Sequence, residues 1–297
     1  SAGTDAYLNL GNALYEQGRY AEALDATRVA VEQRPEYAKA HFNLGAILNV
    51  LGRSEEAETH LRRALALNPQ DVDAHFSLGA ALYKQGRYAE ALEATRVAIE
   101  RDPDFFKAHF NLGAILDALG RFEEAETHLR RAIVLNPQDV DAFRKLIEVL
   151  TPQGRYEEAI DLTVQAVALA PASPQAIELH CLMGQTAQEN GQLEVATEHY
   201  MRALEIDPHY AKAIRRLAHL RSEQQRYDEA LELFQRLIDI DPSDAVAHGN
   251  MGIVLFYLGR SNEALQSFDQ ALFLNPNLET ARANRETLLE VIEGNRQ

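Results

Sequence analysis

The chain has 297 residues, of which 46% are hydrophobic and 25% charged, and its formal net charge is -16. So acidic a chain repels phosphate backbones, and we therefore expect no nucleic-acid partner. No apolar run reaches the roughly 18 residues that a membrane span needs, so we also expect no membrane insertion.

Prolines mark a regular interval along the chain. Successive members of the series lie 34 residues apart, except for one step of 37. Proline cannot continue a helix, so each one is interpreted as the end of a repeated helical unit. The series is Pro35, Pro69, Pro103, Pro137, Pro171, Pro208, Pro242 and Pro276.

Glycines repeat with the same interval in two series. The first places a small residue inside a helical pattern, as at Gly45, where Ala57 on the next helix also leaves room for close packing. The second follows seven residues later, as at Gly52, and predicts a turn between two helices. Each unit therefore holds two amphipathic helices.

These residues resemble the tetratricopeptide repeat, in which Leu-Gly, a turn glycine, two alanines and a terminating proline recur in this order. The resemblance covers essentially the whole chain. It implies an all-α fold, a right-handed superhelical solenoid of stacked antiparallel helix pairs. We expect one superhelix over 1–297, with repeats at about 4–37, 38–71, 72–105, 106–139, 140–176, 177–210, 211–244 and 245–278 and a polar capping helix at 279–293.

Two units depart from the pattern. In the fifth, Ile147 replaces the close-contact glycine and Pro152 falls where the first helix should end, which predicts a short or bent helix. The three-residue insertion after it indicates a change of curvature near residue 174, either as tolerated drift or as a hinge. In the seventh, Ala218 and Gln225 replace the two glycines.

The resemblance implies that the first helices line a concave groove and leave one stripe of each uncovered. Relative to the first glycine, this stripe includes the positions six, three and two before and one and four after. In the front units it carries an apolar rail that begins at Leu8 and a row of asparagines, which offer both a donor and an acceptor to peptide amides. The candidate residues are Asn9, Asn12, Tyr15, Phe42, Asn43, Phe76, Ser77, Tyr83, Phe110 and Asn111. Packing between repeats is the alternative role for these side chains.

Further back, the stripe becomes basic, and we expect it to hold an acidic group of a partner. The candidates are Arg144, Lys145, Lys212, Arg215 and Arg216. Pairing with Glu148, Glu178 and Glu223 nearby is the alternative. Asn250 stands beside Phe256 and Tyr257, which form either a second aromatic contact or packing for the capping helix.

No arrangement of residues predicts chemistry. The histidines mostly follow the repeat period, as His41, His75 and His109 do, and are explained by periodic packing rather than by a metal site. Cys181 has no basic neighbour in sequence to activate it and cannot form an internal disulfide. We expect no enzyme, no cofactor and no metal. A cytoplasmic location suits the single cysteine, and a periplasmic or other exported one stays open.

The function expected from the resemblance is a scaffold that binds a partner protein or extended peptide in its concave groove. Two alternatives stay open. The chain could be the substrate-recognition arm of a larger enzyme, such as an O-linked N-acetylglucosamine transferase-like glycosyltransferase, whose superhelix has a similar asparagine row. It could also self-assemble into a homo-oligomeric platform.

Overall fold

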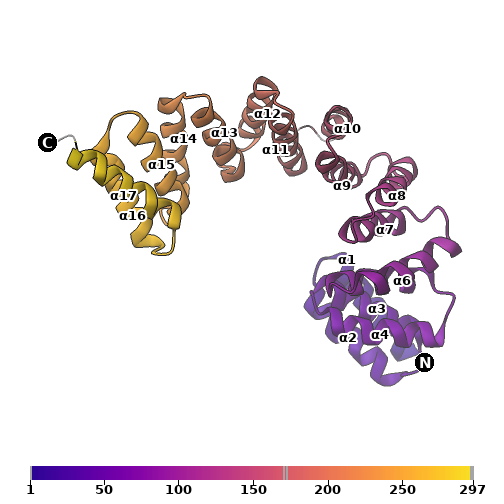
Figure 1. Cartoon of the computed structure of the whole chain (residues 1–297). Helices are drawn as coiled ribbons and strands as arrows, with labels where there is room; N and C mark the ends of the chain where they lie inside the picture. Colours follow the sequence, from indigo (N-terminus) through magenta and orange to yellow (C-terminus); the bar gives the residue numbers. More distant parts are fainter. Residues whose placement is uncertain (1, 170, 172, 295–297) are drawn as a thin grey trace. The chain divides into compact units, whose positions relative to one another are not determined.

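The computed structural model describes residues 2–169, 171 and 173–294. Over these residues the chain forms seventeen α-helices and one 3-10 turn, with no strand, so the predicted all-α class is confirmed. The helices gather into two compact units, Ser1–Val149 and Leu150–Gln297, which are described separately below. Figure 1 labels the helices along the chain.

The first unit is a stack of helix pairs. Helices α1, α3, α5 and α7 each pack on the even-numbered helix that follows, and these four helices also contact one another in turn. They therefore share one face of the stack. The helices are α1 (Ala2–Glu16), α2 (Tyr20–Gln33), α3 (Ala38–Val50), α4 (Ser54–Leu67), α5 (Val72–Lys84), α6 (Tyr88–Arg101), α7 (Phe106–Ala118), α8 (Phe122–Leu135) and α9 (Val140–Leu150).

The second unit repeats this packing and ends in a single helix. Its elements are η1 (Thr151–Gln153), α10 (Tyr156–Leu169), α11 (Pro174–Glu189), α12 (Leu193–Ile206), α13 (Ala211–Glu223), α14 (Tyr227–Ile240), α15 (Ala245–Tyr257), α16 (Ser261–Leu274) and α17 (Glu279–Gly294). Helix α17 lies against α15 and α16, where Ala281 and Leu288 join the core around Phe268. The expected division into eight repeats and the change of curvature near residue 174 stay predictions, and Ala170 and Ala172 lie outside the described residues.

Close contact between paired helices explains the first glycine series. A Cβ atom at Gly45 would lie 2.6 Å from Cγ of Leu61, and one at Gly184 would lie 2.6 Å from Cε1 of Tyr200. Both distances are far below van der Waals contact, so a larger residue would force the helices apart. The predicted role of Gly45 is confirmed.

A left-handed residue closes the turn between the helices of each pair. The second glycine series, including Gly86, has φ between 71° and 75°, which confirms the predicted turns. In the seventh repeat Gln225 stands at this place with φ 59°. A side chain in this conformation is strained, so this turn is held against its local preference.

The first helix of the fifth repeat is short, as predicted. Helix α9 has 11 residues, whereas α3, α5 and α7 have 13 each. The chain then tightens into the 3-10 turn that contains Pro152. Proline cannot donate the backbone hydrogen bond that would continue the α-helix.

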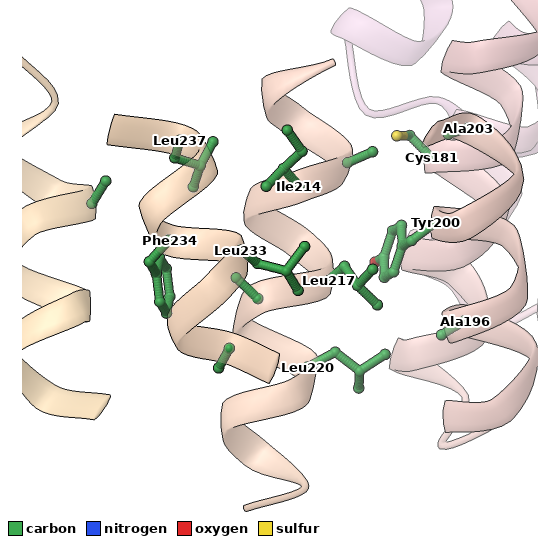
Figure 2. Packing of buried hydrophobic residues seen from close by; sticks show 14 of the residues in the cluster. Cys181, Ala196, Tyr200, Ala203, Ile214, Leu217, Leu220, Leu233, Phe234 and Leu237 are labelled. Atoms are coloured by element: carbon green, nitrogen blue, oxygen red, sulfur yellow. The ribbon is translucent and has the colours of Figure 1, made fainter. Parts of the chain in front are cut away.

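The core of the second unit is built where successive repeats meet. Figure 2 shows Tyr200 of α12 pointing toward Leu217 of α13, with Phe234 of α14 on the other side of that helix. Tyr200 is buried, and its hydroxyl donates a hydrogen bond to Oε1 of Gln188 at 3.1 Å. This bond lets a large ring fill the space beside Gly184 without leaving its hydroxyl unpaired.

Three pairs of histidines join the two helices of a repeat. The Nδ1 atoms of His41 and His60 lie 3.0 Å apart, and the rings stack with centroids 5.3 Å apart. The same geometry recurs in the pairs His109–His128 and His180–His199. One hydrogen can lie between two such nitrogens, so protonating both rings would set two N–H groups against each other.

We predict that replacing Gln225 with glycine stabilises the chain by about 0.5–1 kcal/mol, because glycine adopts a positive φ without strain. The midpoint of urea unfolding measures the change. The matched control is Gln224→Gly, since Gln224 has an ordinary φ of -76° and glycine there should only lower stability. Equal effects of the two substitutions would contradict the strain argument.

We predict that the histidine pairs make stability fall in mild acid. Burial is the first cause that lowers the pKa of His60, His128 and His199, in the last case to about 4. A base whose folded pKa lies below its unfolded value of about 6.5 binds fewer protons when folded. The contribution of such a histidine to the free energy of unfolding is therefore complete above the unfolded pKa of about 6.5 and is lost as the pH falls toward 4.

The test replaces all three with alanine, the residue that Ala94 shows to be tolerated at this place in the third repeat. Urea unfolding at pH 7, 6, 5 and 4 should give a smaller loss of stability for the triple variant than for the parent chain. His209→Ala, in an exposed connection, is the control and should leave the pH dependence unchanged. Parallel pH profiles for the parent and the triple variant would refute the prediction.

Candidate functional site

The candidate groove of the first unit contains a cavity on the face of the odd-numbered helices. Its volume is about 310 Å³. Helices α1, α3 and α5 supply most of its wall, and the connection into α7 closes one side. The lining residues are Asn12, Tyr15, Phe42, Asn43, Ala46, Ile47, Asp73, Phe76, Ser77, Phe105 and Lys107.

Helical spacing places these side chains together. Phe42 and Phe76 stand three residues before the close-contact glycines of α3 and α5, and Asn12 stands one residue after that of α1. Residues three or four apart lie on one side of a helix, so the stacked pairs align the corresponding positions of successive repeats. The structure thus brings six of the predicted residues into one cavity: Asn12, Tyr15, Phe42, Asn43, Phe76 and Ser77.

Aromatic rings form much of the cavity wall. Phe76 meets Phe105 edge to face with their centroids 5.2 Å apart, and Tyr15 meets Tyr20 in the same way at 5.3 Å. Burial raises the pKa of Tyr15, so its hydroxyl stays protonated and can donate or accept a hydrogen bond. Such a wall suits an apolar side chain with a polar group beside it.

The asparagines of the first two repeats are linked. Nδ2 of Asn43 donates to Oδ1 of Asn12 at 2.7 Å. This bond leaves the amide nitrogen of Asn12, which is exposed, as a donor and the carbonyl oxygen of Asn43 as an acceptor. A donor beside an acceptor matches the two polar groups of a peptide unit.

The polar rim of the cavity carries both signs of charge. Asp73 of α5 and Lys107 of α7 are both exposed lining residues. Burial and the nearby Asp71 carboxylate raise the pKa of Asp73, whereas Lys107 acts to lower it. The cavity therefore offers a cation and an anion beside an aromatic wall.

Five lining residues were absent from the predicted set. Asp73 and Lys107 stand six residues before their glycines, a position that belongs to the predicted stripe, so the pattern could have found them. Ala46 and Ile47 lie on α3 beside Asn43. Phe105 lies in the connection before α7, outside any helical period, and only the folded chain places it here.

The remaining front candidates lie elsewhere on the same unit. Asn9 is exposed, and Phe110 is half-buried. Tyr83 is half-buried against Tyr88, with the centroids 5.5 Å apart. Nδ2 of Asn111 is buried without a hydrogen-bond partner.

The apolar rail expected to begin at Leu8 needs a correction. Leu8 is only 3% exposed and packs with Ala30 and Ala40 under the next repeat. The same sequence position therefore carries a core residue in the first repeat and a lining residue in the second and third.

The basic residues of α9 are paired within the first unit. Arg144 donates to Glu148 at 2.8 Å and to Asp141 at 3.0 Å. Nζ of Lys145 donates to Oδ2 of Asp117 at 2.7 Å. The pairing with Glu148, which the sequence left open, is present and leaves these two cations largely compensated.

The other three basic candidates lie on α13 in the second unit. Nη2 of Arg215 contacts Oδ2 of Asp244 at 2.5 Å, and Nη2 of Arg216 donates to Oε1 of Gln185 at 3.3 Å. Lys212 and Arg216 are exposed. The five cations are thus divided between the two units, and Lys212 and Arg216 are the two exposed members of the set.

The rear aromatic residues Phe256 and Tyr257 meet edge to face with their ring centroids 5.7 Å apart. Both line a cavity of about 180 Å³ together with Leu288 of α17, as the capping-helix alternative expected. Tyr257 is 60% exposed and stacks on Tyr227 with an interplanar angle of 4°. Nδ2 of Asn250 lies 3.5 Å from Nε2 of His219.

In the part of the chain that the structure describes, no three His, Cys, Asp or Glu side chains come together as metal ligands would. Cys181 is 1% exposed, and burial raises the pKa of its thiol to about 11, which keeps it protonated and unreactive. Nor does any helix described here have the length and apolar character to cross a membrane.

Two family models match the sequence. Residues 1–179 match the model described as the Cilia and flagella-associated protein 70 C-terminal domain. Residues 187–249 and 221–284 match the model described as the tetratricopeptide repeat. No curated protein matches the chain.

Two similar solved structures indicate the same architecture. The APC/C hetero-tetramer Cut9-Hcn1 contains a chain with 18% identity and a TM-score of 0.58, over 96% of this chain and 55% of that one. YrrB, titled a TPR protein with an unusual peptide-binding site, has 22% identity and a TM-score of 0.52, over 66% of this chain and 99% of that one. At these identities the likeness is one of fold, and the chain spans about half the length of the first of these relatives.

Proposed function

We propose that this chain is a non-catalytic scaffold that binds an extended peptide. It belongs to the tetratricopeptide repeat family, and its residues 1–179 belong to the family of the Cilia and flagella-associated protein 70 C-terminal domain. The peptide lies along the odd-numbered helices in the concave groove. The single observation that supports this most is the cavity between α1, α3 and α5.

The cavity suits one residue of such a peptide. Its volume of about 310 Å³ accommodates an apolar side chain against Phe42 and Phe76. Asn12 and Asn43 then hydrogen-bond the neighbouring peptide unit, as their free donor and acceptor allow. Asp73 and Lys107 favour peptides that carry charges on either side of the apolar residue.

The exposed cations of α13 support a second contact, with an acidic group of the partner. Lys212 and Arg216 are at the surface, so an acidic group of the partner could pair with them without displacing an internal carboxylate. The alternatives of a glycosyltransferase recognition arm and a self-assembling platform stay predictions.

We predict that Phe76→Ala weakens peptide binding about tenfold or more, since truncating an aromatic residue of the cavity wall removes apolar contact area at the centre of the site. A random peptide library is selected on the parent chain, and the dissociation constants of the selected peptides are then measured by calorimetry. Adding Asn43→Ala should weaken binding further, because one peptide hydrogen bond is lost.

The control is Val134→Ala on α8, a surface change away from the cavity that should leave binding unchanged. Circular dichroism confirms that each variant is folded. If the selected peptides bind the parent and the Phe76→Ala, Asn43→Ala double variant equally well, the proposed site is wrong.

A further inference from the structure

A second kind of groove lies on the face of the even-numbered helices. In the first unit it runs between α4 and α6 above α5, with a volume of about 750 Å³. Its floor is apolar, with Leu65, Leu78 and Val97 among the lining residues. His75 of α5 and Ala94 of α6 are both among its lining residues.

In three other repeats, a histidine ring occupies the position that Ala94 has in the third repeat. Ala94 stands 15 residues after the close-contact glycine of its repeat, and His60, His128 and His199 hold this position in theirs. There each ring stacks on the partner histidine, and Nδ1 bonds to Nδ1 at 2.9–3.0 Å. In the third repeat, alanine supplies no ring to stack on the half-buried His75, and both residues line the groove.

The ring of His75 makes the same backbone hydrogen bond as the paired ring of His41. Nε2 of His75 lies 3.1 Å from the carbonyl oxygen of Pro69, and Nε2 of His41 lies 3.0 Å from that of Pro35. A carbonyl only accepts, so Nε2 carries the hydrogen and Nδ1 of a neutral His75 is an acceptor. By the equivalence with His41, this Nδ1 points toward the place above Ala94.

The eighth repeat repeats the arrangement. His248 binds the carbonyl of Pro242 through Nε2 at 3.2 Å, and Ser267 stands where the second histidine would be. Both line a groove of about 630 Å³ between α14 and α16. Two unpaired histidines thus border two open grooves, one in each unit.

We propose that these two grooves bind a partner segment that inserts a histidine ring onto His75 or His248 and so completes the pair that the chain makes internally elsewhere. The ring donates its N–H to the free Nδ1, while apolar neighbours cover the floor. Arg62, Glu90 and Glu93 line the groove in the first unit, and Glu93 contacts Arg96 while its side chain stays 73% exposed. Charge complementarity therefore favours a segment whose flanking residues carry both signs of charge.

The probe is a synthetic peptide with the sequence of α4, residues 54–67, in which acidic residues precede His60 and Leu61, Arg62 and Arg63 follow it. A second peptide has alanine in place of this histidine. Binding to the full chain is followed by NMR of the His75 and His248 imidazole signals. We expect saturable shifts with the first peptide and an affinity about tenfold lower for the second, since a hydrogen bond and ring contact are lost.

The matched test fills each groove with a histidine ring of this chain itself. Ala94→His should form an internal pair with His75 and abolish the peptide-induced shift there, while the shift at His248 remains. Ser267→His should do the reverse. Circular dichroism and the retained response at the other groove show that each variant is folded.

Three results would overturn the proposal. One is the absence of any saturable shift of the imidazole signals up to about 2 mM peptide, since even weak specific sites have dissociation constants in the millimolar range or below. Another is equal binding of the two peptides. The third is unchanged binding to the Ala94→His, Ser267→His double variant. Concentration-dependent light scattering of the parent that the double variant loses would instead assign a second copy of this chain as the occupant and reject a foreign partner.

Discussion

Close approach of two helices within each repeat is the constraint on which the rest of the structure depends. Gly45 lies against the side chain of Leu61, and Gly184 lies against the ring of Tyr200, with no room for a methyl group in between. This contact sets the distance between the helices of a pair. The face that carries Phe42 and Asn43 therefore has the same orientation in successive repeats, and corresponding side chains meet in one cavity.

The two faces of the helix stack differ in how their side chains are used. On the odd-numbered helices of the first unit, rings, amides and opposite charges surround a cavity that none of the described residues fills. On the even-numbered helices, histidine rings close three repeats from within, whereas Ala94 and Ser267 leave two grooves open. Repeats with the same backbone can thus offer different surfaces, because one side chain decides whether a groove is filled.

Several site residues were predictable because they follow the helical period. Phe42, Phe76 and Asn12 occupy the predicted stripe, and Asp73 and Lys107 could have been added from the same rule. Phe105 could not, because it lies in a connection where no period applies. Contacts between repeats decide burial, so the same position is core at Leu8 and lining at Phe42.

By itself, the sequence determined the helical pairs, the turns and the family, since proline, glycine and the spacing of apolar residues act through local backbone geometry that depends little on distant contacts. The tertiary structure alone decided which polar and charged side chains have partners on other helices. Lys145 of α9 is compensated by Asp117 of α7, and His41 is paired where His75 is not. Such pairings join residues on different helices, and the distance between them exists only once the helices have packed.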